Sequence, residues 1–250
     1  MQVDEVPLIR ASRLLAEGFA HGFSTRAGGV SEGAFESLNL ARTVGDEAAL
    51  VAENSRRFSH ALGVSTRNVY EVSQVHGRAL VEVERHDDVA ATRLLEADAL
   101  LTRHPGLAVA VRTADCVPVL LANRSSGAVA AVHAGWRGVT ARIVEGALAR
   151  LGDAKDICAT IGPHIRAFEV GDDVAAQIDE VSHGATVVEA RDPRPHVDLA
   201  AALCAQLEHG GVHDIEDVGG CTLSEGARFF SYRRDAGVTG RHLSAIVARG

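Results

Sequence analysis

The chain of 250 residues contains 46% hydrophobic and 23% charged residues and carries a formal net charge of −8. This composition is that of an ordinary soluble protein, and the length suffices for one core, so we expect a single domain over residues 1–250. The negative charge argues against general affinity for nucleic acid or for an anionic membrane. It still allows a local basic pocket, so we expect small-molecule partners.

The first residues and the cysteines indicate the compartment. Met1 is followed by Gln-Val-Asp-Glu-Val, without a basic start, an apolar core or a cleavage site, so we expect no secretory signal. The longest apolar stretches are strand length, too short to cross a bilayer. The cysteines lack paired spacing and are interpreted as reduced thiols, so we predict a cytoplasmic protein, either a monomer or a small homo-oligomer. Cys158, Cys204 and Cys221 are expected to be buried small side chains.

Strands and helices are interspersed, and several strands follow one another through short turns. This pattern predicts a mixed sheet with helices outside it, not a regular βαβ array. Neither a dinucleotide-binding glycine motif nor a P-loop is present. The predicted elements, in chain order, are an ordered glycine-rich loop at 21–41, a helix capped by Asp46 and ending at Leu62, strands at 69–75, 79–84, 107–112, 117–122 and 128–133, a helix at 137–151, a strand at 156–161, helices at 171–182 and 198–208, and strands near 214–223, 228–233 and 242–248.

Three residues far apart in the chain are metal-ligand types at the ends of apolar runs. His76 lies in Gln-Val-His-Gly, Cys116 in Thr-Ala-Asp-Cys-Val-Pro, and His133 in Val-His-Ala-Gly-Trp-Arg-Gly. Two imidazoles and a thiolate are donors that a catalytic zinc uses when its fourth position is open. If the strand ends converge, the sequence predicts a metal centre. Pro118 suggests an irregular or edge position for the strand after Cys116.

The spacing of these residues leaves other interpretations open. His133 could lie beside a capped helix start with Trp136 in the core, and Cys116 could be a buried thiol. Cys116 could also be a nucleophile with His133 as its base.

The loop 24–31 is a second candidate site. Hydroxyls, an arginine and two glycines in succession suit an anion nest, with Ser24, Arg26, Gly28 and Gly29 as candidate contacts to phosphate. A tight surface turn with a solvated arginine is equally compatible with this pattern. Arg137, beside His133, is a candidate for additional positive charge.

Taken together, the motifs resemble the YfiH, or laccase-domain, family over nearly the whole chain. Members of that family have been called polyphenol oxidases, peptidoglycan editing factors and purine nucleoside phosphorylases. The motifs that carry the resemblance lie at 21–31, 74–77, 97–102, 113–119, 131–138, 161–163, 168–171 and 230–235, whereas 183–197 matches no motif of the family.

The resemblance implies an α+β protein, a single-domain α/β/β/α sandwich with mixed sheets. It also implies a metal, usually zinc with copper as an alternative, at His76, Cys116 and His133. The implied activities are phosphorolysis of adenosine, inosine and methylthioadenosine, and deamination of adenosine. In this interpretation Arg26 contacts phosphate, and Asp115 or, equally, Asp98 relays a proton.

Three alternative functions remain at this stage. A cysteine hydrolase using Cys116 and His133 could act on peptidoglycan precursors. A copper polyphenol oxidase would need more ligands, typically in His-x-His pairs, which the sequence lacks. A non-enzymatic zinc-binding protein would hold its metal in a closed site with four ligands.

Overall fold

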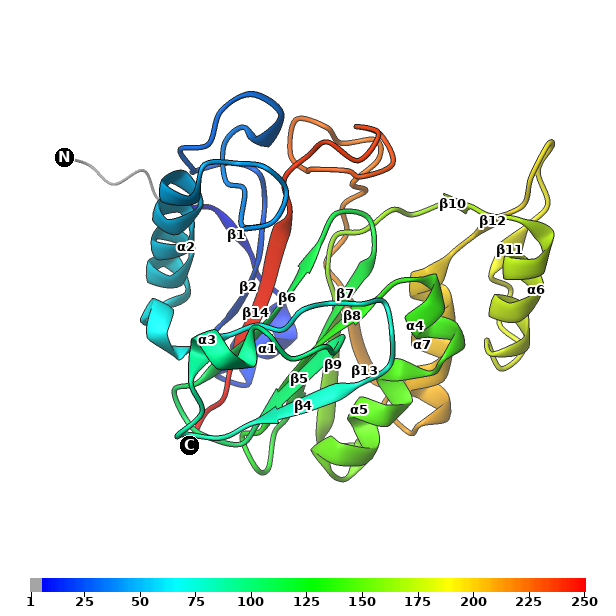
Figure 1. The fold of residues 1–250 in the computed structure, drawn as a ribbon. Coiled ribbons are helices and arrows are strands. Elements are labelled where there is room, and N and C mark those ends of the chain that lie inside the picture. Colours follow the sequence, from blue (N-terminus) through cyan, green and yellow to red (C-terminus); the bar gives the residue numbers. More distant parts are fainter. Residues whose placement is uncertain (1–5) are drawn as a thin grey trace.

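Two β-sheets packed face to face form the centre of the protein, and helices cover their outer faces (Figure 1). The computed structural model describes residues 6–250, so the first residues, where we expect no secretory signal, lie outside the described part. The layers follow the order helix, sheet, sheet, helix, which is the α/β/β/α sandwich that the resemblance implied. Across residues 6–250, no helix is long and apolar enough to cross a bilayer.

The first sheet has five strands in the order β1-β2-β14-β6-β3. Its pairs are antiparallel except for β3 with β6, so the sheet is mixed, as predicted. The strands are β1 (Leu8–Ile9), β2 (His21–Ser24), β3 (Val69–Tyr70), β6 (Ala108–Thr113) and β14 (His242–Val247).

The second sheet has six strands in the order β13-β9-β7-β8-β5-β4 and is also mixed. Its two outermost pairs, β13 with β9 and β4 with β5, are parallel, and the pairs between them are antiparallel. The strands are β4 (Leu80–Val83), β5 (Ala99–Thr102), β7 (Val117–Asn123), β8 (Val129–Ala134), β9 (Ile157–Ile161) and β13 (Asp214–Asp217).

The burial of β7 on both faces explains why residues 117–122 form an unbroken apolar run. Alternate side chains of a strand point to opposite faces of the sheet. Val119 and Leu121 pack on the helix side, whereas Leu120 and Ala122 pack against the other sheet. Both faces of this strand are therefore buried, and neither selects polar residues.

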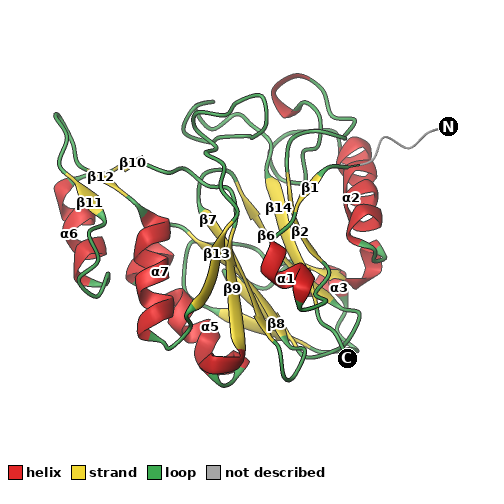
Figure 2. Cartoon of the chain, turned by 180° about the vertical axis from the view of Figure 1, so that it is seen from behind, coloured by secondary structure: helices red, strands yellow, loops and turns green. Residues whose placement is uncertain are grey.

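The helices enclose the two sheets on opposite sides, as Figure 2 shows from behind. Helix α2 packs on the five-stranded sheet through Phe58 and Leu62, and α5 and α7 pack on the six-stranded sheet through Val144 and Leu203. The helices are α1 (Ser12–Ala16), α2 (Ala48–Leu62), α3 (Val89–Thr92), α4 (Trp136–Thr140), α5 (Ile143–Leu151), α6 (Asp172–Glu180) and α7 (Leu199–His209), with short 3-10 turns η1 (Gly33–Phe35), η2 (Thr66–Asn68) and η3 (Ala154–Asp156).

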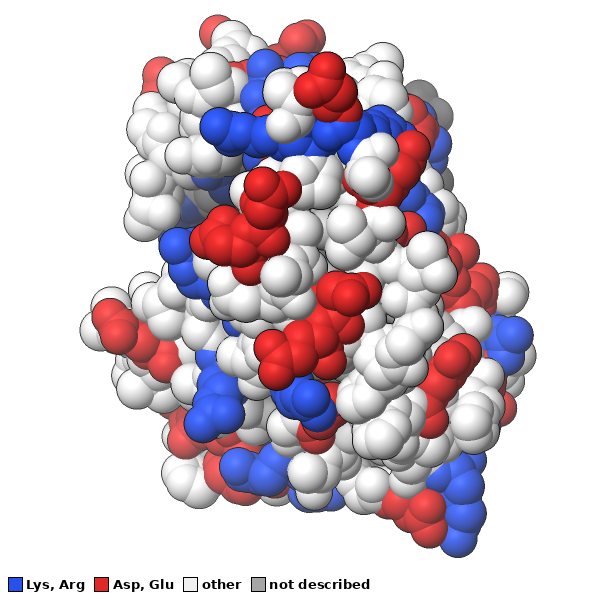
Figure 3. Space-filling model, turned by 90° about the vertical axis from the view of Figure 1, so that its right-hand side faces the viewer, with Lys and Arg blue, Asp and Glu red and all other residues white. Residues whose placement is uncertain are grey.

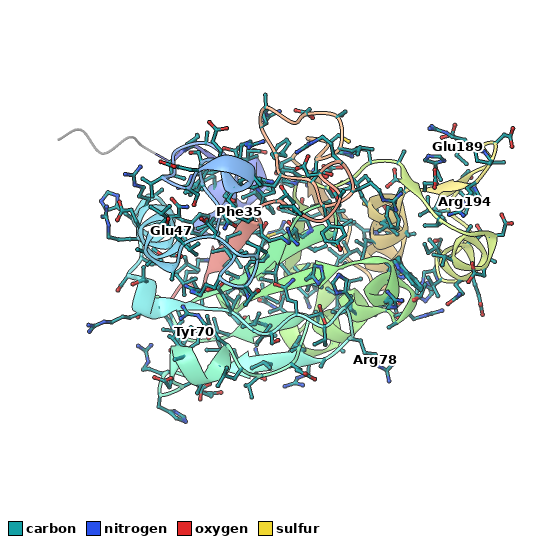
Figure 4. All side chains as sticks on the ribbon, turned by 45° about the horizontal axis from the view of Figure 1, so that its top comes forward. Phe35, Glu47, Tyr70, Arg78, Glu189 and Arg194 are labelled. Atoms are coloured by element: carbon teal, nitrogen blue, oxygen red, sulfur yellow. The ribbon has the colours of Figure 1, made fainter. Side chains whose placement is uncertain are left out.

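A small third sheet lies at one end of the molecule. Its strands β10 (Phe168–Glu169), β12 (His196–Val197) and β11 (Val188–Glu189) pair antiparallel beside α6. Glu189 and Arg194, in the stretch that matched no family motif, lie at the opposite end of the molecule from Glu47 at the start of α2 (Figure 4).

Four predicted strand boundaries were wrong. The predicted strand 214–223 ends at Asp217, since Gly219 and Gly220 adopt positive φ. Residues 21–24 of the predicted loop form β2. The predicted strand 69–75 ends at Tyr70, because the amides of residues 75–77 turn toward the Asp98 carboxylate. Residues 228–233 form turns and not the predicted strand. The Arg234 side chain donates hydrogen bonds to backbone carbonyls there, in place of pairing with another strand.

Two helix predictions also need correction. The predicted helix 137–151 is two helices, because Arg142 adopts the left-handed conformation with φ of 56°. Helix α2 begins at Ala48 with Glu47 as its cap, since the Asp46 carboxylate accepts hydrogen bonds from Ser31 and Asn39.

The expectation of an edge or irregular position at Pro118 was wrong as well. Strand β7 is central, paired with β8 and β9. Pro118 is tolerated because pairing with β9 begins only at Val119, so no ladder bond to β9 needs its missing N–H. Of the three other cysteines, Cys158 is buried as expected, but Cys204 and Cys221 are only partly buried.

Candidate metal centre and its cavity

The three predicted metal-ligand residues lie together. One donor atom from each of His76, Cys116 and His133 falls within 4.8 Å of the others. His76 comes from the loop between β3 and β4, Cys116 immediately precedes β7, and His133 lies in β8. The pairing of β7 with β8 sets Pro118 opposite His133, which brings Cys116 beside the imidazole. The structure thus joins residues that the sequence separates.

Asp98, just before β5, orients both histidines. Its carboxylate accepts the Nδ1–H of His133 at 2.7 Å, which leaves Nε2 of that ring facing the other two donors. The same carboxylate accepts backbone N–H groups from Val75, His76 and Gly77 at 3.2, 3.0 and 2.6 Å. Asp98 is fully buried and is therefore a positioning residue for the centre.

The backbone is strained at two places around the centre. His76 has φ of 59° and Asp115 has φ of 103°, values that residues other than glycine rarely adopt. Such strain persists only where the surroundings enforce it, and it clusters at functional sites. At Gly135, an added Cβ would lie 3.1 Å from Cys116 Sγ and 3.1 Å from His76 Cδ2, so glycine leaves room for the donors.

The pKa shifts reflect the close approach of these groups. Burial raises the pKa of Cys116, but the two histidines outweigh burial and lower it below the usual thiol value. Burial lowers the pKa of His133, but the Cys116 thiolate and Asp98 outweigh it and raise the pKa. Burial raises the pKa of Asp98, but hydrogen bonds from His133 and Gly77 outweigh burial and lower the pKa below its usual value, so Asp98 is a carboxylate. The arrangement therefore favours the thiolate that a metal requires.

The donor set fits a divalent metal ion such as zinc. It combines a soft thiolate with two imidazoles, and in the described part of the chain no fourth His, Cys, Asp or Glu joins the group. This is the ligand number of a catalytic centre and not of a closed structural site with four protein ligands.

A cavity of about 700 Å³ opens onto the three donors. Its walls carry a mixture of cationic and aromatic side chains, although the protein as a whole is acidic. On the face drawn in Figure 3, acidic and basic side chains are interspersed, so the net negative charge forms no single patch there. The cationic and aromatic side chains that line the cavity are Arg93, Arg112, Arg137, Arg233, Arg241, Trp136, Phe168 and Tyr232.

The remaining predicted residues next to the ligands also line this cavity. Asp115 is nearly buried, and its two oxygens accept hydrogen bonds from the Thr222 hydroxyl at 2.6 Å and the Arg233 amide at 2.7 Å. Arg137 is exposed, with its guanidinium 4.3 Å from the centre of the Trp136 ring. Arg78, which follows His76 and Gly77, instead points away from the sheets (Figure 4).

The 24–31 loop lies elsewhere, because none of its residues lines the cavity. Arg26 donates to the carbonyls of Glu36 and Gly226 and stacks over Phe230. Ser24 accepts the Leu243 amide, and the Gly29 amide is bonded to the Ser37 hydroxyl. Gly28 has φ of 92°, and a Cβ at Gly29 would meet the Ser37 carbonyl, so both glycines serve the turn. The predicted phosphate contacts are thus not brought to the metal donors.

Three arginines of the cavity, Arg93, Arg112 and Arg241, were not predicted from the sequence, whereas Arg233 lies in the motif at 230–235. Arg112 is the penultimate residue of β6, four residues before Cys116, and Arg241 directly precedes β14. Position at a strand end was the signal used for the metal donors, and it also applied to Arg112. Nothing in the sequence pattern marked Arg93.

Known proteins that are similar to this chain define its family. Residues 20–249 match the family model described as "Multi-copper polyphenol oxidoreductase laccase". The solved structure of YfiH from Bacillus licheniformis is 29% identical with a TM-score of 0.87, covering 99% of this chain and 97% of that one. YlmD from Geobacillus stearothermophilus is 32% identical with a TM-score of 0.86, and 93% of each chain is covered. The chain belongs to this YfiH, or laccase-domain, family, and the sequence resemblance is confirmed.

Curated relatives carry a functional name. A protein of Deinococcus radiodurans named purine nucleoside phosphorylase is 42% identical over 98% of this chain and 94% of its own length. The Escherichia coli protein named purine nucleoside phosphorylase YfiH is 38% identical over 92% of this chain and 94% of its own length.

Proposed function

We propose that this protein is a purine nucleoside phosphorylase that accepts adenosine, inosine and methylthioadenosine and also deaminates adenosine. One observation carries the proposal: a single cavity joins a His-Cys-His donor set to a wall rich in arginine. The names of the relatives agree with the phosphorolytic activity. We further propose that it acts in the cytoplasm as one domain, on small molecules only.

Zinc is the metal that we propose for His76, Cys116 and His133. When bound there, it would supply a Lewis acid and activate water at neutral pH. The neighbouring residues have the complementary task of fixing the donors, with Asp98 holding His133 in the tautomer that leaves Nε2 available. Copper is a less suitable occupant for a laccase reaction, because residues 6–250 contain only this one group of three donors.

In phosphorolysis, a phosphate oxygen forms a bond to ribose C1′ while the bond from C1′ to the purine nitrogen breaks. The electron pair of that bond leaves with the purine, which takes up a proton. The arginines of the cavity bind the phosphate dianion and align it with C1′, so the chain contributes mainly positioning and charge. Trp136 and Phe168 supply flat apolar surface for the base.

In deamination, water adds to purine C6 and ammonia leaves, so one proton must move from the water to the leaving nitrogen. Asp115 is our candidate for this relay, since it lines the cavity next to Cys116. Asp98 is less suited, because it is fully buried and its oxygens already accept four hydrogen bonds.

A cysteine hydrolase is the second candidate function, and one observation favours it. Asp98, His133 and Cys116 stand in the order carboxylate, imidazole, thiol, which is the order of a nucleophilic triad. Such an enzyme would act on peptidoglycan precursors without a metal. Chelation would leave its activity intact, and alkylation of the thiol would abolish it.

The test begins with purified protein of known metal content, incubated with inosine or adenosine with and without inorganic phosphate. We expect hypoxanthine or adenine with ribose 1-phosphate only when phosphate is present, and inosine from adenosine without it. Cys116→Ala should lose bound zinc and fall below about a hundredth of the normal activity, since even supporting ligands contribute about 10-fold to 100-fold. Cys204→Ala is the matched control. A zinc-loaded protein that releases no base would contradict the proposal.

A further inference from the structure

A buried carboxylate beside the cavity is surrounded by three arginines. Glu71 is 4% exposed, and its Oε1 lies 2.9 Å from Arg42 NH1 and 3.4 Å from Arg93 Nε. Its Oε2 lies 3.1 Å from Arg112 NH1. Arg93 and Arg112 line the cavity, and Arg42 lies between two residues that line it, Ala41 and Thr43. None of these four charged residues is a ligand of the metal centre.

The charges of this cluster do not balance. One carboxylate faces three guanidinium groups, so the cluster carries two uncompensated positive charges. The pKa of Arg93 is lowered, first by burial and then by repulsion from Arg42 and Arg112, in spite of the attraction of Glu71. An anion at the cavity wall would relieve this repulsion.

The cluster also has unused hydrogen-bond donors. Of its three contacts with Glu71, only that of Arg42 has hydrogen-bond geometry. Arg93 Nε is buried, and among residues 6–250 it makes an ion pair with Glu71 but no hydrogen bond. A guanidinium has five N–H donors arranged to match the oxygens of a phosphate, so the arginines retain the capacity for two-pronged contacts.

The position of Arg112 is fixed by its neighbours. Gln74 accepts the Arg112 amide and donates to the Arg112 carbonyl, each at 2.7 Å, and Arg112 NH2 donates to the Val72 carbonyl. Gln74 is two residues from His76, and Arg112 is four residues from Cys116, a backbone span of at most about 14 Å. Two segments therefore hold Glu71 and Arg112 of the cluster, together with the metal donors His76 and Cys116, at the same cavity.

We propose that Arg42, Arg93 and Arg112, held around Glu71, form the subsite that binds inorganic phosphate as the nucleophile of the reaction. This inference rests on the proposed phosphorolysis. Glu71 keeps the three guanidiniums together without neutralising them, and the two excess charges match a phosphate dianion. The subsite replaces the 24–31 loop as the phosphate site, because no residue of that loop lines the cavity and Arg26 already donates from Nε and NH1 to backbone carbonyls.

The test measures binding of inorganic phosphate to the zinc-loaded protein by isothermal titration calorimetry, alone and with saturating hypoxanthine. Arg93→Met is the main variant, because no hydrogen bond of its side chain supports the fold of the described residues. Arg42→Met is the second. We expect each to weaken phosphate binding by about 10-fold to 100-fold, the effect of losing a charge-assisted contact. The KM for phosphate should rise similarly, and the KM for the nucleoside should not.

The matched control is Arg150→Met. Arg150 and Arg103 share the carboxylate of Glu82, at 2.9 and 3.0 Å, in an ion-pair cluster that does not line the cavity. This variant should bind phosphate like the unaltered protein. If Arg93→Met and Arg42→Met fold and bind phosphate normally, or if the unaltered protein binds none, the subsite is disproved. If phosphate binds and the variants weaken it but no nucleoside is cleaved, the subsite stands and the proposed reaction fails.

Discussion

The metal centre and the 24–31 loop were both predicted from their residue types, but they use their polar groups differently. At the centre, Asp98 binds only one nitrogen of His133 and leaves the other facing Cys116 and His76. In the loop, Arg26 donates to two backbone carbonyls and stacks on a ring. A residue of a suitable type can bind a ligand only where the fold leaves its lone pairs or N–H groups available.

The largest effect is expected from Asp98→Asn, which keeps the shape of the side chain and removes its charge. An asparagine can accept from the loop amides or from His133 but offers a weaker acceptor and an amide N–H in place of one oxygen. We expect zinc affinity and phosphorolysis to fall by about 10-fold to 100-fold. Metal titration with a competing chelator, together with the rate of base release, measures both.

Asp87→Asn is the control for this change, because Asp87 accepts the Glu84 amide in an exposed turn. It should retain full metal affinity. Normal zinc binding in Asp98→Asn would mean that the carboxylate does not orient the histidine.

The second test is Arg26→Ala, which separates a phosphate contact from a structural arginine. Loss of its hydrogen bonds to Glu36 and Gly226 should lower the free energy of unfolding by about 1–3 kcal/mol. Phosphorolysis and deamination should change equally in the folded protein. A selective loss of phosphorolysis would restore Arg26 as the phosphate contact. Chemical denaturation and paired rate measurements distinguish the two outcomes.

Much of the fold could be predicted because its signals are local. The apolar runs at β6, β7 and β8 predicted the central strands to within one or two residues, and the predicted helix 198–208 matches α7 to within one residue. The segment 71–76 could not be predicted, because its departure from the strand depends on Asp98, more than twenty residues away. Local apolar pattern does not report such a partner.

The candidate site shows the same limit. His76, Cys116 and His133 could be selected because each stands at the end of an apolar run. Their convergence depends on strand pairing, which the sequence does not give. Arg93 lies in no motif, and its role emerges only from its distance to Glu71. Sequence identifies donors by type, whereas the three-dimensional structure decides which of them meet.

The smallest effect concerns His242 at the start of β14, which ties the turn at 228–233 to that strand. Its Nε2 accepts the Phe230 amide at 2.8 Å, and Phe230 is the ring under Arg26. Burial lowers the pKa of His242 to about 3, from 6.5. Between these values the unfolded chain binds a proton that the folded protein excludes. Stability therefore falls as the pH drops below 6.5, by up to about 1.4 kcal/mol per pH unit.

His242→Gln tests this sign, since an amide oxygen can still accept the Phe230 N–H but does not titrate. The variant should lose stability less steeply between pH 6.5 and pH 4 than the unaltered protein, by about one bound proton. His60→Gln, at an exposed position of α2, is the control and should leave the slope unchanged. Urea denaturation at several pH values gives the slopes directly. Equal slopes for His242→Gln and the unaltered protein would mean that His242 is protonated in the folded state. In that case the Phe230 amide has another acceptor, and the ring under Arg26 is not fixed by β14.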